Sequence, residues 1–282
     1  MTLFRALRDA AIRPPIAVIQ IQPQNNNRPV SPMSFPAIRE LASSVDGMMT
    51  VSAMSIMDSL LSFQEMHDIT GHVIEFGVYK GRSAAVLAGH AIAPERLILV
   101  DVADCLDRAA LAQVRAPAEY VLCPSEKFRS LYRGWKSLRG KCRFIHIDTS
   151  HYYRATLSEM RLAELLIQDR GILALDDFTN LHYSQVAAAV HRYLCTARTK
   201  LSIFLLTNEK AFLCKQRDFD FYCSFVLEGI GKEIEARGLG KICLARTEID
   251  PDYRPVYLRP ARDSDDGPVY GADLFGHYYA KP

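Results

Sequence analysis

The sequence predicts an α/β fold, with a mostly parallel sheet, helices on both faces and an antiparallel hairpin at its end. From residue 72 onward, short apolar runs alternate with amphipathic segments, which is typical of β-α units in a parallel sheet. Residues 201–216 then form two apolar runs joined by the turn TNEK, which predicts the hairpin. With 282 residues, the chain is long enough for one large domain with extensions.

The expected strands are short apolar runs, at 72–76, 97–100, 120–123, 144–147 and 172–175. The expected helices that alternate with them lie at 82–92, 105–115, 125–137, 152–168 and 181–195. Two further helices are predicted earlier, at 37–46 and 51–68, where methionines and leucines recur at helical spacing. We interpret that methionine stripe as core packing rather than as a ligand-binding face. Together these elements predict a domain over residues 36–217 with the early helices included.

The two ends of the chain have a different composition. Residues 1–35 are interpreted as an N-terminal extension, because a short strand-like stretch at 16–21 lies among prolines and an Asn run. Residues 218–282 are interpreted as a C-terminal extension, irregular from Asp250 on and without a core of its own. We expect both segments to pack on the main domain or on another subunit, and a homodimer is the simplest such assembly.

Composition and charge narrow the class of function. The net charge is +2, so no nucleic-acid partner is expected, and a basic cluster from Lys127 to Arg143 is interpreted as a solvated helix face. Seven cysteines without a CxxC pair favour a reducing, cytoplasmic location. Charges interrupt every apolar run near the N-terminus, so no signal peptide is expected. No apolar run approaches about 18 residues, so no membrane span is expected.

The first predicted strand ends in an acid and two glycines, in the stretch VIEFGVYKGRSA. Gly77 and Gly81 remove side chains where the chain turns into a helix, so backbone could approach a ligand closely. A phosphate loop would need GxGxxG or a Lys-Ser/Thr pair, and neither is present. Glu75 would repel a pyrophosphate and favour an amine or a sulfonium. A tight turn with a solvated Glu75 is the alternative.

Acidic or polar groups also follow the other predicted strands, where open α/β sheets bind ligands. Asp101 is placed to accept hydrogen bonds from both hydroxyls of a ribose, or else to cap the next helix. Asp148, Asp176 and Asp177 follow two later strands, and like charges there would cost on the order of 4 kcal/mol per pair at 4 Å. Mg²⁺ would relieve this repulsion. Because adjacent strand residues face opposite ways, Asp176 and Asp177 can both be ligands only if the strand has ended.

Three segments together resemble a known family: VIEFGVYKGRSA, LILVD and FIHIDTSHYYRATLSEMRLAELLIQDRGILALDDF. They are similar to class I S-adenosylmethionine-dependent methyltransferases, and most of all to small-molecule O-methyltransferases of the macrocin O-methyltransferase and cephalosporin-hydroxylase-like groups. The resemblance covers about residues 70–216 and implies a Rossmann-like methyltransferase fold with a mostly parallel seven-stranded sheet. The sequence departs from the pattern at Thr149, where many relatives have Gly.

The resemblance also implies roles for particular residues. S-adenosyl-L-methionine would be bound by Glu75, Gly77, Gly81 and Ser83 at its methionine part, by Asp101 at its ribose, and by Ser125 and Glu126 at its adenine. Relatives hold a divalent cation, often Mg²⁺, at the positions of Asp148, Asp176 and Asp177.

Three histidines lie near these strand ends. His182, after LDDF, is the general-base candidate, and Asp148 is the other candidate for catalysis. His151 would orient a carboxylate or touch the substrate, and His146 is interpreted as structural.

The function predicted from the sequence is therefore methyl transfer from S-adenosylmethionine to a small-molecule hydroxyl, with help from a divalent metal. Two alternatives stay open. One is a methyltransferase-like domain that binds or assembles without catalysis. The other is a nicotinamide-dependent oxidoreductase, against which the missing GxGxxG argues.

Overall fold

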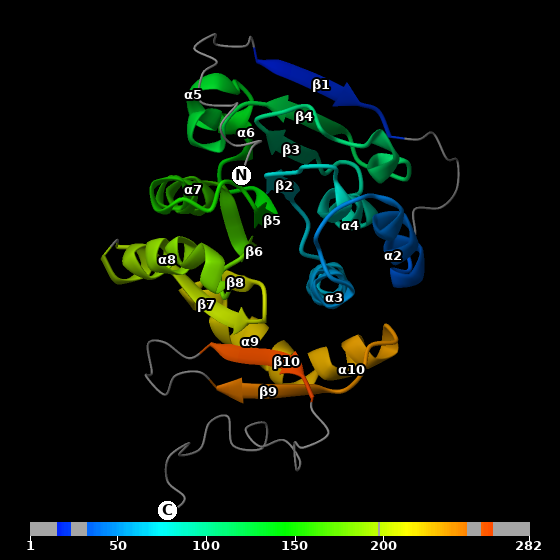
Figure 1. Ribbon diagram of the computed structural model, residues 1–282, viewed down its shortest axis with the longest axis vertical. Helices are drawn as coiled ribbons and strands as arrows, with labels where there is room; N and C mark the ends of the chain where they lie inside the picture. The colour runs from blue at the N-terminus through cyan, green and yellow to red at the C-terminus, as the bar shows by residue number, and fades with distance from the viewer. Residues whose placement is uncertain (1–15, 24–32, 197, 247–254, 262–282) are drawn as a thin grey trace, which may run out of the picture.

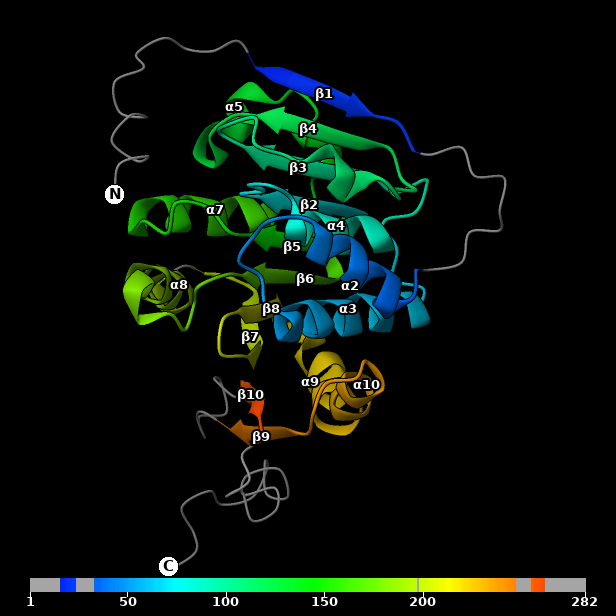
Figure 2. The ribbon, with the colours of Figure 1, turned by 45° about the vertical axis from the view of Figure 1, so that its right-hand side comes forward.

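A single mixed sheet forms the centre of the protein, and helices cover both of its faces (Figures 1 and 2). The computed structural model describes residues 16–23, 33–196, 198–246 and 255–261. In these residues the sheet has ten strands, in the order β1-β4-β3-β2-β5-β6-β8-β7-β10-β9. This arrangement confirms the predicted α/β class.

The parallel part of the sheet contains the five strands predicted first, namely β2 (His72–Phe76), β3 (Leu97–Asp101), β4 (Ala118–Leu122), β5 (Cys142–Ile147) and β6 (Ile167–Leu175). Neighbours among them pair in parallel. The chain steps from β2 to β3 and β4 in one direction, and then returns to the other side of β2 as β5. Strand order therefore reverses between β2 and β5, and ligands of such sheets bind beyond the carboxyl ends at this point.

The predicted hairpin is also present. It consists of β7 (Leu201–Leu206) and β8 (Ala211–Lys215), which pair antiparallel. Strand β8 lies between β6 and β7 and is antiparallel to both. The hairpin therefore completes the seven-stranded, mostly parallel sheet that the resemblance implies. Its turn, at residues 207–210, is brought beside the end of β6.

Three additional strands widen the sheet beyond seven. Strand β1 (Ala17–Ile21) pairs antiparallel with β4, β10 (Val256–Pro260) pairs in parallel with β7, and β9 (Ile242–Arg246) pairs antiparallel with β10. The expectation of irregular chain from Asp250 on is therefore wrong at Val256–Pro260. Val256 and Leu258 alternate into the core, which is why this proline-flanked segment is a strand. The boundaries of the two extensions remain a prediction.

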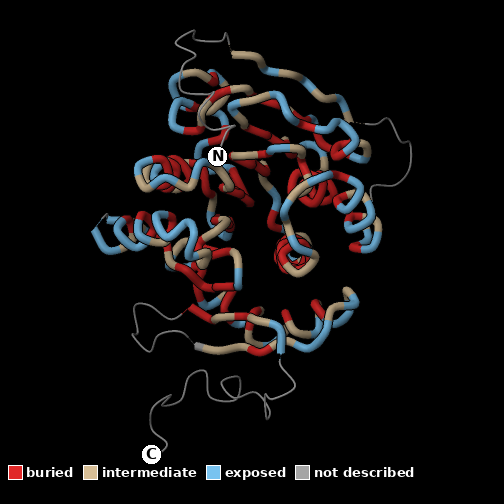
Figure 3. Tube along the Cα trace, viewed as in Figure 1, coloured by how far each residue is buried: buried red, intermediate tan, exposed pale blue. Residues whose placement is uncertain are grey.

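Two groups of helices bury the two faces of the sheet, and the red segments of the tube in Figure 3 show the buried residues of the helices and strands. One face is covered by α2 (Phe35–Ser44), α3 (Val51–Met66), α4 (Arg82–His90), α9 (Phe219–Glu228) and α10 (Ile230–Ala236). The other is covered by α5 (Phe128–Leu131), α6 (Trp135–Leu138), α7 (Tyr153–Leu166) and α8 (Ser184–Thr196). Val73 packs in the first group and Ile74 in the second, so Glu75 lies on the α4 side. Met54 and Met57 are buried there, which confirms their packing role.

Two predicted helices are much shorter in the structure. The segment 105–115 has only one 3₁₀ turn, Arg108–Leu111, and 125–137 is divided into the 3₁₀ turn Ser125–Lys127, α5 and α6. Helix α5 ends at Leu131, and the hydroxyl of the next residue, Tyr132, donates to Glu119 and accepts from Arg96. A tertiary contact therefore overrides the local helical pattern.

Arg143 also differs from the expectation of a solvated basic face. It lies on β5, is only 1% exposed, and binds both carboxylate oxygens of Glu95. None of the helices in the described ranges is long and apolar enough to cross a membrane.

Candidate functional site

The turn after β2 requires its glycines. Gly77 has a φ of 84°, and a Cβ atom there would lie 1.7 Å from the backbone oxygen of Asp148. Gly81 has a φ of 96°, and a Cβ atom there would lie 2.6 Å from a methyl group of Leu106. Both positions combine left-handed backbone with close packing, so any side chain would displace the turn. The turn is thereby held against the end of β5.

Glu75 is fully buried beside this turn, and its two carboxylate oxygens differ. Oε1 accepts a hydrogen bond from the hydroxyl of Ser83 at 2.5 Å and another from Nδ1 of His146 at 2.7 Å. Oε2 is buried and has no hydrogen-bond partner among the residues that the structure describes. A buried carboxylate oxygen without a donor is costly, so Oε2 marks a position at which the donor group of a ligand would be stabilising.

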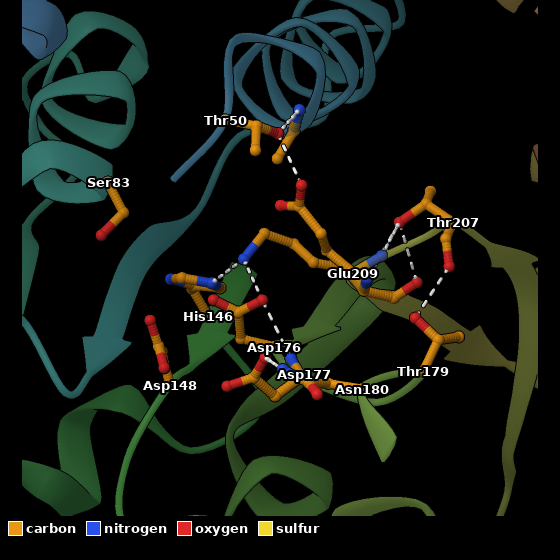
Figure 4. A network of polar contacts seen from close by, with 12 residues as sticks. Thr50, Ser83, His146, Asp148, Asp176, Asp177, Thr179, Asn180, Thr207 and Glu209 are labelled. Atoms are coloured by element: carbon orange, nitrogen blue, oxygen red, sulfur yellow. Dashed lines mark hydrogen bonds and ion pairs between the residues drawn. The ribbon is translucent and has the colours of Figure 1, made fainter. Parts of the chain in front are cut away.

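A chain of buried polar side chains runs from Glu75 through His146 and Lys210 to Asp176. Figure 4 shows the part of this chain from His146 to Asp176. The ammonium of Lys210 lies 3.2 Å from Nε2 of His146 and 2.7 Å from Oδ1 of Asp176. Because the ammonium can only donate, Nε2 of His146 is the acceptor. Nδ1 therefore carries the hydrogen, and it donates a hydrogen bond to Glu75. His146, interpreted as structural from the sequence, therefore links Glu75, beside the glycine turn, to Lys210 and the acidic end of the sheet.

Lys210 is 1% exposed and was not identified from the sequence as a site residue. Its backbone is fixed because its N–H donates to Thr207 Oγ1 at 2.9 Å, within the turn of the hairpin. The neighbouring Glu209 accepts a hydrogen bond from Thr50, the N-cap of α3 (Figure 4). Only the insertion of β8 beside β6 brings this lysine to the site, and the sequence pattern does not show that insertion.

The three aspartates lie together, but they face different partners. Asp148 and Asp177 both contact His151, whose Nε2 lies 3.2 Å from an oxygen of each. Asp176 turns instead to Lys210. Ligand atoms of Asp148, His151 and Asp177 all lie within 4.8 Å of one another, a spacing that could hold a metal ion. Strand β6 ends at Leu175, which is why consecutive aspartates are both at the site.

The charges of this cluster are strongly coupled. Burial works to raise the pKa of Asp176, but the ammonium of Lys210 holds that pKa far below its usual range. Burial and the neighbouring charge of Asp176 raise the pKa of Asp148. Burial opposes protonation of His151, yet the hydrogen bond with Asp148 and the charges of the carboxylates together raise its pKa. Without a metal ion, the positive charge that balances the three carboxylates therefore comes from Lys210 and His151.

Asp101 is already engaged by the protein backbone. Its Oδ2 accepts hydrogen bonds from the N–H groups of Val78 and Tyr79, both at 2.8 Å. Its Oδ1 accepts from Val102 at 2.6 Å and from Ala103 at 3.2 Å. The carboxylate thus ties the end of β3 to the glycine turn, and its predicted role at a ribose remains a prediction.

Ser125 and Glu126 occupy the turn after β4. Ser125 is buried and donates to Oε1 of Glu159 at 2.5 Å, whereas Glu126 is exposed. Thr149 donates to the same oxygen at 2.7 Å, so the residue that departs from the family pattern helps to join the β4 and β5 loops. Glu159 lies in the middle of α7, where no sequence signal identifies it. Its other oxygen is buried without a partner in the described part of the chain.

His182 lies in the exposed 3₁₀ turn Leu181–Tyr183, and in the described structure its side chain makes no hydrogen bond or ion pair with the three aspartates. Its neighbour Tyr183 does reach the site, because its ring lies 4.4 Å from the ring of His151. The general-base role of His182 therefore remains a prediction. His151, the weaker candidate from the sequence, is the histidine at the acidic cluster.

Comparison with known proteins agrees with this geometry. A family model described as a methyltransferase domain matches residues 74–178. No curated protein sequence matches the chain.

Solved structures similar to the chain include cofactor-bound Rv0187 from MTB, with 12% identity and a TM-score of 0.47 over 64% of this chain and 88% of that one. The O-methyltransferase from Bacillus cereus in complex with SAH has 11% identity and a TM-score of 0.46 over 64% and 88%. CalS11, a TDP-rhamnose 3'-O-methyltransferase of calicheamicin biosynthesis, has 16% identity and a TM-score of 0.41 over 64% and 92%. At these values the likenesses carry no inference about substrate.

The matched residues begin in β2, include the glycine turn and Asp101, and end just after the aspartate pair. The match therefore contains most of the strand ends described above. The resemblance to methyltransferases noted in the sequence is therefore confirmed at this level, because residues 74–178 match the model of a methyltransferase domain.

Proposed function

We propose that the protein transfers a methyl group from S-adenosylmethionine to a hydroxyl group of a small molecule. The observation that carries this proposal is the buried Oε2 of Glu75, which has no partner in the described chain and lies at the glycine turn of a methyltransferase domain. A buried carboxylate oxygen favours a cationic donor. The methionine part of S-adenosylmethionine carries such a donor, its ammonium group.

The surrounding residues fit the same cofactor. Gly77 and Gly81 keep side chains out of the turn, and Ser83 holds the other oxygen of Glu75. Asp101, at the end of the adjacent strand, is our proposed ribose ligand. Ser125 and Glu126 remain the proposed adenine contacts. Glu159 would hold Ser125 in position by accepting a hydrogen bond from its hydroxyl.

S-adenosylmethionine, when bound, supplies an electrophilic methyl group. The protein's own residues must hold the acceptor oxygen in line with that methyl and receive its proton. Positioning of this kind can contribute roughly 7–11 kcal/mol to lowering the barrier. We retain His182 as the proposed base and Asp148, Asp176 and Asp177 as the region that holds a divalent cation, Mg²⁺ in the first instance.

Exposed apolar side chains near these strand ends support a small-molecule acceptor. Tyr79 follows β2, Tyr152 follows β5, and Leu181 and Tyr183 follow β6, and Leu181 is 91% exposed. Exposed hydrophobic groups gathered beside a polar site commonly mark a binding surface. We therefore propose an acceptor whose hydroxyl is attached to an apolar or aromatic body.

The test is transfer of a tritiated methyl group from S-adenosylmethionine to a panel of phenols, catechols and sugars. We expect a labelled ether with at least one class, and loss of the reaction in EDTA with recovery on adding a divalent ion. The variant His182→Ala should lower turnover by about a hundredfold, with little change in KM for the cofactor, because a general base contributes roughly 10²–10⁴.

The alternatives give different results. Binding of S-adenosylhomocysteine with no transfer to any acceptor would favour a non-catalytic domain, and tight binding of NAD with no response to the adenosyl ligands would favour an oxidoreductase. A full rate in EDTA would remove the metal from the mechanism. Unchanged turnover in His182→Ala would remove that histidine.

Two broader expectations are also part of the proposal. None of the seven cysteines is in a disulfide bond, which supports a reducing compartment such as the cytoplasm. A homodimer remains the simplest assembly for a chain with long ends, and sedimentation equilibrium at micromolar protein would show a monomer if this is wrong.

A further inference from the structure

We propose that Glu159 is a positioning residue for the adenine end of the cofactor site, and that Thr149 makes this end depend on the loop after β5. Glu159 holds the loop after β4 through Ser125 and the loop after β5 through Thr149. The inference rests on the proposed function for its ligand, but the connection between the two loops can be tested without any ligand.

Glu159 is a buried carboxylate with two donors on one oxygen. It lies in the middle of α7 and is only 2% exposed. Its Oε1 accepts the hydroxyl of Ser125 at 2.5 Å and the hydroxyl of Thr149 at 2.7 Å. Burial raises the pKa of this carboxyl, and both hydrogen bonds oppose that rise because they stabilise the charged form. One carboxylate oxygen is therefore shared by two loops that are far apart in the sequence.

The two loops follow strands that are not neighbours in the sheet. Strands β3 and β2 lie between β4 and β5, so no ladder of the sheet joins the ends of β4 and β5 directly. Helix α7 packs on this face of the sheet and also contacts the 3₁₀ turn Ser125–Lys127. A side chain from α7 can therefore reach both loops, and Glu159 is the residue that does so.

Thr149 also borders the glycine turn. A Cβ atom on Gly77 would lie 3.1 Å from Cα of Thr149, so the turn packs directly on this part of the β5 loop. Thr149 therefore lies between the turn proposed to hold the methionine part of the cofactor and the carboxylate of Glu159. Glycine, which the family pattern has at this position, carries no hydroxyl and could not make the second hydrogen bond.

Ser125 is the residue through which this connection reaches the ligand. It lines a cavity of about 370 Å³, whose wall also includes Glu126, Trp135 and Leu162. The cavity lies beside the end of β4, and a flat purine ring suits a cavity with an aromatic side chain in its wall. Because the hydroxyl of Ser125 is bound to Glu159, the position of this wall depends on Glu159.

Hydrogen exchange of the full chain without ligand tests the connection between the loops. Thr149→Val removes the hydroxyl but keeps the shape of the side chain. We expect exchange in a peptide that contains residues 124–131 to accelerate, although the substitution lies in another loop. Glu159→Leu should accelerate exchange in the same peptide. Thr149→Ser, which keeps a hydroxyl, should retain the native rate.

Thr156→Val is the matched control. Thr156 is also buried in α7, but its hydroxyl donates to the backbone oxygen of Tyr152 at 3.1 Å rather than to Glu159. This variant should leave exchange in residues 124–131 and the affinity for the cofactor unchanged. Unchanged exchange there in Thr149→Val, or an equal acceleration in Thr156→Val, would overturn the connection.

Calorimetry with two ligands tests the effect on the cofactor site. S-adenosylhomocysteine is the complete ligand, and 5′-methylthioadenosine keeps the adenine and ribose but lacks the amino-acid part. Thr149→Val should weaken both by the same factor, about fivefold or more, because the adenine end has lost its support. Thr149→Ser should bind both within about twofold of the native chain. Glu75→Gln, by contrast, should weaken only S-adenosylhomocysteine.

A double variant shows whether the effect of Thr149 passes through Glu159. In Glu159→Leu, adding Thr149→Val should cost no further affinity, since the connection is already lost. A further loss equal to that of Thr149→Val alone would contradict this path. The threonine variants decide the result even if Glu159→Leu does not fold.

Unchanged affinity for both ligands in Thr149→Val would overturn the inference, even if the free energy of unfolding falls, because Glu159 would then only stabilise the fold. A loss confined to S-adenosylhomocysteine would also overturn it, since the effect would lie at the methionine end. Binding that depends on Glu75 but not on Thr149 contradicts only this inference. Failure of the native chain to bind either adenosyl ligand contradicts the proposed function, and the positioning role with it.

Discussion

At the scale of single residues, Asp101 illustrates two uses of one carboxylate. Four backbone N–H groups already donate to it, two of them from Val78 and Tyr79 in the glycine turn. A carboxylate accepts about four hydrogen bonds, so its capacity is filled. If Asp101 binds a ribose, the hydroxyls must replace N–H donors. Cofactor binding and the conformation of the glycine turn are therefore expected to be linked.

Replacing Asp101 by Asn tests this link. The amide nitrogen of Asn cannot accept hydrogen bonds, so some of the backbone N–H groups that donate to Asp101 would lose their acceptor. We therefore expect binding of S-adenosylhomocysteine to weaken by about tenfold or more. Hydrogen exchange in a peptide that contains residues 77–81 should also accelerate, because the turn loses acceptors. Asp104→Asn, at an exposed acid paired with Arg108, serves as the control. Unchanged exchange in the turn would contradict the role given to Asp101.

At the scale of elements, a buried histidine joins helices α3 and α4. His90, near the end of α4, lies 2.9 Å from Asp58 and 2.8 Å from Glu65, both on α3. Arg237, just after α10, binds the second oxygen of Asp58 at 2.6 Å. Burial opposes the charged form of His90, but the two carboxylates outweigh it and raise its pKa. This contact fixes α4, whose first turn contains Ser83.

The stability of the protein should depend on pH through this contact. Because the pKa of His90 is raised in the folded state, its stabilisation is complete below the ordinary value of 6.5 and is lost as pH rises through the folded-state pKa. Denaturant unfolding should therefore show the free energy of unfolding falling as pH increases above about 6.5. His90→Gln should flatten this dependence and cost about 3 kcal/mol at pH 6. His67→Gln is the control, and an equal pH dependence in both variants would exclude the contact as its cause.

The elements also show which local patterns are sufficient for prediction. Strands β2 to β6 were predictable because their apolar runs are buried on both faces and bounded by turns. The helix expected over 125–137 was not, because the chain leaves the helical conformation at Tyr132, whose hydroxyl binds Glu119 and Arg96. Strand β10 was also missed, since prolines and acids surround the two residues that enter the core.

At the scale of the whole molecule, sheet topology decides how much of the site the sequence reveals. Asp148 and Asp176 follow neighbouring parallel strands, so their proximity was predictable. Lys210 and the pairing of His151 with two carboxylates were not, because they depend on β8 entering between β6 and β7 and on the course of one loop. The residues that tune the charges of the site therefore depend on strand order and loop course, which the sequence pattern does not show.

The central claim is that S-adenosylmethionine binds at the carboxyl ends of β2 and β5, where the strand order reverses. Calorimetric titration of the full chain with S-adenosylhomocysteine tests it most directly, with Glu75→Gln as the matched variant. We predict one site per chain with a Kd of about 10 μM or tighter, near −7 kcal/mol, a weakening of about tenfold or more in Glu75→Gln, and no heat with NAD. No saturable binding of S-adenosylhomocysteine up to millimolar concentration, or tight binding of NAD, would contradict the account.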